Sequence, residues 1–92
     1  MRIVGEIKHP EWKITLFQMD TRFSVKFEQG QLEQTYKFRT GDFIQSVQDV
    51  RRLITPAFIE KVADIFSQMT DLSRDTLASQ KEKELNEFDE II

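Results

Sequence analysis

The chain has 92 residues, a formal net charge of −3 at pH 7 and no cysteine. The lack of cysteine excludes disulfides, thiolate metal sites and thiol nucleophiles, and it fits a reducing compartment. A chain of this size buries roughly 60–65% of its unfolded surface, which is enough for a modest core without covalent cross-links.

We expect one domain over residues 1–92, with a β-meander at 1–40, helices at 42–78 and a helical tail at 79–92. The first residues lack the apolar run of a secretory signal, and no stretch is apolar enough to cross a bilayer. These observations predict a cytoplasmic protein that does not associate with membranes.

Residues 2–39 alternate in hydrophobicity with the period of two that is typical of half-buried strands. Three turn signals divide them into four strands, which predicts an antiparallel meander in the order 1-2-3-4. Each turn places apolar residues on the same face, and Ile3, Gly5 and Ile7 form the inward row of the first strand. The expected pairs are Ile7 with Trp12 across residues 8–11, Gln18 with Phe23 across Asp20-Thr21, and Phe27 with Leu32 across a turn containing Gln29-Gly30.

After Thr40 the apolar residues recur at helical spacing. Asp42 with Gln45 predicts an N-cap for a helix near 42–54, and Thr55 with Pro56 predicts the start of a second helix over 56–78. Residues 57–92 contain no Gly or Pro, so one long helix and two collinear helices both remain open. Helices covering one face of the meander make a two-layer α+β fold.

Charge is divided unevenly along the chain. Residues 1–41 carry seven Lys/Arg against five Asp/Glu, whereas residues 42–92 carry six against eleven. By parity, all seven basic residues of the first part lie on the outer face of the sheet, which then nets about +4. Cross-strand pairs such as Lys26 with Glu33 favour a simple solvated face. The face also has two apolar exceptions, Val4 and Phe17. Its remaining basic side chains favour a binding face instead, formed by Phe17, Arg22, Lys26, Lys37 and Arg39.

The C-terminal residues keep a few apolar side chains in a polar context. They have no place in a small core already covered by two helices, so we expect them to meet a partner or a second copy. This self-association strip consists of Leu85, Phe88, Ile91 and Ile92.

No constellation of residues predicts catalysis, a cofactor or a metal. His9 is the only histidine and lies beside Pro10 in a predicted loop, without a positioned partner for acid–base work. The glycines are isolated, so no phosphate-binding loop exists. Carboxylates at Glu60, Asp64, Asp71 and Asp75 share a helical face, which we interpret as solvated rather than metal-binding.

The sequence therefore favours a non-enzymatic module that binds a protein or forms a homodimer. The alternative is single-stranded nucleic-acid binding through the basic outer face, where Arg22, Lys26, Lys37 and Arg39 would hold phosphates beside Phe17. Four antiparallel strands followed by a helix resembles the layout of single-strand-binding families such as the PUR-repeat proteins. This likeness is one of topology and carries no site residues over. An enzyme would require a site built between protomers.

Overall fold

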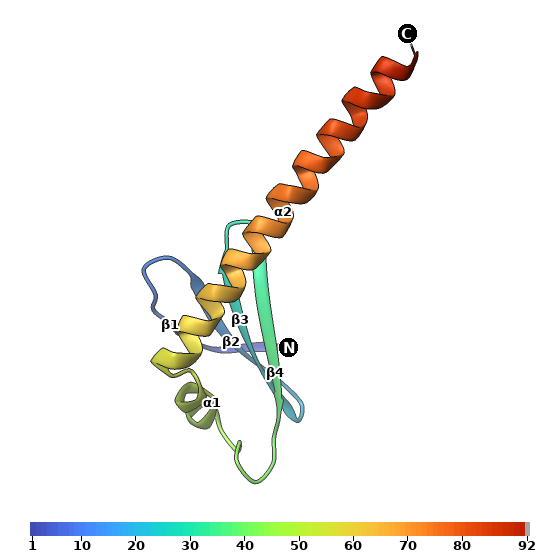
Figure 1. Ribbon diagram of the computed structural model, residues 1–92. Helices are drawn as coiled ribbons and strands as arrows, with labels where there is room; N and C mark the ends of the chain where they lie inside the picture. Colours follow the sequence, from blue (N-terminus) through green and yellow to red (C-terminus); the bar gives the residue numbers. More distant parts are fainter. Residues whose placement is uncertain (92) are drawn as a thin grey trace.

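The protein is described by a computed structural model that covers the backbone of residues 1–91 and the side chains of residues 1–81. It is an α+β fold in which a four-stranded antiparallel sheet of order β1-β2-β3-β4 is covered on one face by helices, as the sequence predicts (Figure 1). The elements are β1 (Arg2–Ile7), β2 (Lys13–Met19), β3 (Arg22–Gln29), β4 (Leu32–Arg39), α1 (Val47–Leu53) and α2 (Pro56–Ile91).

The central hairpin has the register that the alternation predicts. Gln18 lies opposite Phe23 and Leu16 opposite Val25, with Asp20-Thr21 as the two-residue turn. Asp20 takes a φ of 50°, a left-handed conformation that Asp tolerates better than most residues. Leu16 and Val25 are almost completely buried and face the helices, so the predicted inner face of this hairpin is confirmed.

The two outer hairpins differ from the predicted pairing by two residues. Ile7 lies opposite Ile14 rather than Trp12, and Phe27 lies opposite Gln34 rather than Leu32. The third turn is Gly30-Gln31, with Gly30 at a φ of 60° that suits glycine. Because side chains alternate with period two, a shift of two residues keeps the apolar rows on the same face.

A β-bulge in β1 places the first residues of this strand on the opposite faces from those predicted. The register shifts between Ile3 and Gly5, so Ile3 lies opposite Phe17 on the outer face, whereas Val4, expected on that outer face, packs against the core. Arg2, expected on the outer face, lies opposite Gln18 and donates to its Oε1 at 3.2 Å. One extra residue in a strand reverses the alternation beyond it, and the sequence has no strong signal for it.

The core lies between the sheet and the helices. From the helices, Val50, Val62 and Phe66 are each at most 2% exposed, and they meet the inward rows of the strands. Gln34 is buried among these apolar side chains because both ends of its amide are satisfied. Its Nε2 donates to the Val62 carbonyl at 3.0 Å, and its Oε1 accepts from the Tyr36 hydroxyl. This amide ties β4 to α2.

Helix α1 begins later than the predicted start at Asp42. Its N-cap is Ser46, and the Asp49 carboxylate accepts from the backbone N–H groups of Gln45 and Ser46 at 2.9 and 3.2 Å. These bonds, with the nearby Arg52 guanidinium, hold the pKa of Asp49 below its ordinary value, although desolvation acts in the opposite direction. Phe43 recurs at helical spacing with Val47, Val50 and Ile54, which predicts one stripe, but it lies before the helix and is 92% exposed, so the stripe begins at Val47.

Helix α2 begins as predicted, with Thr55 Oγ1 accepting from the Phe58 N–H at 3.1 Å and Pro56 as the first residue. Of the two alternatives for residues 57–92, one continuous helix is what the structure shows up to Ile91. Its first turns, residues 56–69, pack on the sheet and are here called the docked segment. Residues 70–91 extend beyond the sheet and are called the projecting segment (Figure 1). The molecule is consequently elongated, with principal extents of 64 × 27 × 20 Å.

Candidate interaction surfaces

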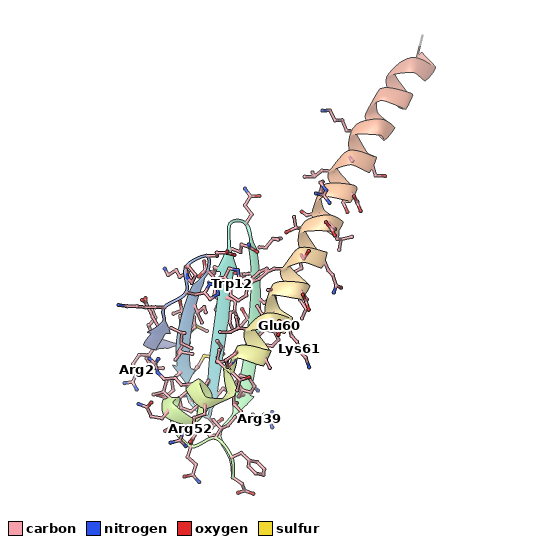
Figure 2. The ribbon with its side chains drawn as sticks, turned by 60° about the vertical axis from the view of Figure 1, so that its left-hand side comes forward. Arg2, Trp12, Arg39, Arg52, Glu60 and Lys61 are labelled. Atoms are coloured by element: carbon pink, nitrogen blue, oxygen red, sulfur yellow. The ribbon has the colours of Figure 1, made fainter. Side chains whose placement is uncertain are left out.

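One end of the outer sheet face is basic. Arg22 lies directly opposite Arg39, and Lys37 follows one row further along β4, opposite Ser24. Directly opposed like charges destabilise a sheet, so this pair costs the isolated chain stability. The three residues Arg22, Lys37 and Arg39 are here called the basic end, and among the side chains of residues 1–81 none of them forms an ion pair. Figure 2 shows Arg39 at the end of the sheet that lies away from the projecting segment.

An apolar patch adjoins the basic end on the same face. Ile3 and Phe17 are direct neighbours across β1 and β2, and Met19 lies one row further along β2. Ile3 is 62% exposed, Met19 is 44% exposed and Phe17 is half-buried. Parity places Phe17 and Met19 on this face but Ile3 on the inner one, because the β-bulge that brings Ile3 outward was not predicted. Ile3, Phe17 and Met19 are called the apolar patch below.

The structure separates Lys26 from the other predicted binding residues. It lies opposite Thr35 rather than Glu33, and its Nζ is 3.7 Å from a Glu28 oxygen and 3.6 Å from a Glu33 oxygen. Thr15, its neighbour on β2, is buried although it lies on the outer face, since the ladder places this short side chain between the longer Glu6 and Lys26. The middle of this face is therefore charge-compensated, unlike the basic end.

The projecting segment is acidic and carries isolated apolar side chains. Residues 70–91 contain seven Asp/Glu against three Lys/Arg. Leu72 and Leu77 are 69% and 70% exposed, and every residue from 70 to 81 is exposed. Asp71 is bound by Arg74, with an Nη2–Oδ1 distance of 2.7 Å. The predicted strip lies outside the described side chains at Leu85, Phe88 and Ile91, and Ile92 lies outside the described residues altogether.

A shallow apolar groove of about 500 Å³ lies where the projecting segment leaves the sheet. Leu32, which the alternation places on the inner face, packs against the core and is half-buried next to the turn. The groove is lined by Gln31, Leu32, Met69, Leu72, Ser73, Thr76 and Leu77.

His9 has a structural role in the loop between β1 and β2. Its ring stacks on Trp12 with centroids 4.3 Å apart, and its Nδ1 accepts from the backbone N–H groups of Glu11 and Trp12 at 3.2 Å each. These two hydrogen bonds and the stacking hold the ring in the loop. An open depression of about 590 Å³ borders this loop, and the buried Trp12 Nε1 has no hydrogen-bond partner among the described residues.

Within the part of the chain that the structure describes, no group of three or more His, Asp or Glu side chains is placed to hold a metal ion. No described helix combines the length and apolar character that a membrane span requires. Comparison with protein-family models, with curated proteins and with solved structures found no match to this chain.

Proposed function

We propose that this chain is a non-enzymatic assembly module that forms a homodimer through the projecting segment of α2. The observation that carries the proposal is the course of this helix, which continues to Ile91 although every residue from 70 to 81 is exposed. Polar helices without tertiary packing are marginal in water, and most helical stability in proteins comes from packing an apolar face. A partner along the projecting segment supplies that packing.

A second copy is the partner that fits best. The chain carries both an acidic helix segment and a basic end with an adjacent apolar patch, so two copies are complementary to each other. Leu85, Phe88 and Ile91 recur at three-residue spacing, which keeps them near one face of a helix. A heterologous protein partner is the alternative to a second copy in the sedimentation test described below.

The absence of cysteine supports a reducing compartment, and we propose a cytoplasmic location on that ground.

Sedimentation equilibrium of the full chain over a range of concentrations tests this proposal. We expect a dimer mass for the native sequence and a monomer mass for the double variant Leu85→Asp/Phe88→Asp, because charges in the strip prevent its burial. The matched control Ser79→Asp/Gln80→Asp adds the same charge to the same segment outside the strip and is expected to remain dimeric. A native chain that sediments as a monomer at every concentration removes the homodimer from the proposal.

Single-stranded nucleic-acid binding is the second candidate function, and the opposed Arg22 and Arg39 are the observation that favours it. Their unpaired charge suits phosphates, and Phe17 offers one half-buried aromatic ring for stacking. A salt titration with labelled single-stranded DNA and RNA decides this candidate. Binding that weakens steeply with salt supports it, whereas absence of binding even at low salt excludes it.

A further inference from the structure

We infer that the C-terminal turns of one copy dock on the apolar patch and basic end of a second copy's outer sheet face. This inference rests on the proposed self-association and adds the surface that receives the helix. The occupant is thus the segment containing Leu85, Phe88 and Ile91, and the receiving surface is formed by Ile3, Phe17, Met19, Arg22, Lys37 and Arg39.

The apolar strip of the tail and the apolar patch on the sheet agree in size. Ile3 and Phe17 lie on neighbouring strands, which are about 4.8 Å apart in a sheet, and Met19 extends the patch along β2. The strip from Leu85 to Ile91 spans about 9 Å along a helix axis at 1.5 Å per residue. A helix laid across β1 and β2 therefore covers Ile3 and Phe17 within two turns.

The charges of the tail and of the receiving face are opposite in sign. Residues 82–92 contain five Asp/Glu against one Lys, whereas the two end rows of the receiving face contain Arg22, Lys37 and Arg39 and no acid. At 3.6 residues per turn, the sequence positions of Glu84 and Asp89 fall on either side of the strip. The acidic helix would relieve the repulsion between the opposed arginines.

The chain's own tail does not reach this surface. Helix α2 covers the opposite face and leaves the sheet past the turn between β3 and β4, where Leu32 and Met69 line the same groove (Figure 1). The basic end lies at the far end of β4, at Arg39 (Figure 2). Two elongated copies placed side by side in opposite directions bring each tail to the other's basic end, and this arrangement closes as a two-fold pair.

The groove at the root of the projecting segment is the less suitable receiver for the same tail. Asp71 and Asp75 stand on the helix turns that border it, and among the side chains of residues 1–81 the ion pair formed there is that of Asp71 with Arg74. An acidic tail meets like charge there, but meets opposite charge at the basic end.

A charge exchange in the full-length chain tests the docking surface. One variant carries Arg22→Glu and Arg39→Glu, and the other carries Glu84→Lys and Asp89→Lys. In sedimentation equilibrium, each variant alone is expected to associate at least tenfold more weakly than the native chain. Their equimolar mixture is expected to recover native association, because each tail then meets a face of opposite charge. The variant Lys8→Glu/Lys61→Glu changes net charge by the same amount as the arginine variant, at exposed positions away from the basic end, and serves as the control.

The outcomes separate this inference from the proposed function. Variants that associate like the native chain, or a mixture that stays as weak as its components, overturn the docking surface while self-association stands. Loss of single-stranded DNA binding in the arginine variant with unchanged association assigns the face to nucleic acid and overturns the inference as well. A native chain that is monomeric throughout removes both proposals together.

Discussion

The docked and projecting segments of α2 form one helix with opposite surroundings. In the docked segment, Val62 and Phe66 are at most 2% exposed and meet the inner face of the sheet, whereas in the projecting segment Leu72 and Leu77 are about 70% exposed. The polar link also belongs to the docked segment, where Gln34 donates to the Val62 carbonyl. The comparison shows that the helix extends well beyond the residues that pack on its own sheet. Residues 70–81 of the projecting segment lack such packing.

The largest expected contrast comes from apolar truncation in the two segments. Phe66→Ala removes a buried ring that packs against Trp12 and is expected to lower the free energy of unfolding by about 3–5 kcal/mol. Leu77→Ala should change it by no more than about 0.5 kcal/mol at concentrations where the chain is monomeric. Urea unfolding of both variants measures this. Similar losses would show that both segments belong to one packed unit.

A pair of glycine substitutions sharpens the same contrast without touching the core. Ala63 and Ala78 are both exposed, one in each segment. Ala63→Gly is expected to lower global stability by about 1 kcal/mol, since glycine disfavours a helix that must form for the protein to fold. Ala78→Gly should leave global unfolding unchanged and instead speed amide hydrogen exchange in the projecting segment alone. An equal effect on the global transition would contradict the division.

A smaller effect of opposite sign is expected at the basic end. Arg39→Glu converts the like-charge pair with Arg22 into an opposite-charge pair, so the monomer should gain about 0.2–1 kcal/mol of stability. The same change should weaken self-association. Chemical unfolding at low concentration and sedimentation at high concentration measure the two effects separately. A variant that loses stability as a monomer would show that Arg39 has a favourable contact within the chain.

The smallest expected effect is the pH dependence contributed by Asp49. Its pKa is held below the ordinary value of 3.8, so its stabilising contribution is present above that value and is lost as the pH falls through the lowered pKa. Asp49→Ala should therefore be less stable than the native chain near neutrality, and the difference should shrink below about pH 3.8. Thermal melts across this pH range provide the measurement, and a constant difference would contradict it.

The sequence predicts the fold well where its pattern is redundant. The alternation in β2 and β3 and the short turn at Asp20-Thr21 determine one register, and Thr55-Pro56 determines the start of α2. The prediction is wrong where a local choice has no strong pattern. Either of two loop lengths at Gly30 keeps the apolar rows on one face, and Ser46 and Asp42 both suit an N-cap.

The candidate surfaces could be predicted only in part for related reasons. Parity identifies Arg22, Lys37 and Arg39, because β3 and β4 alternate without interruption. It does not identify Ile3, since nothing in the alternation of residues 2–7 marks the bulge in β1 that turns Ile3 outward. It also groups Lys26 with the basic residues, although Glu28 and Glu33 both approach its ammonium group in the folded sheet.

The most direct test of the account measures where the tail of one copy lies on another. Because the chain has no cysteine, Glu90→Cys carries a single spin label, and it is mixed with an equal amount of ¹⁵N-labelled native chain. The account predicts intermolecular broadening of the amide signals of Phe17, Ser24 and Lys37. Broadening confined to Leu32, Leu72 and Leu77, or no broadening at any concentration, would contradict it.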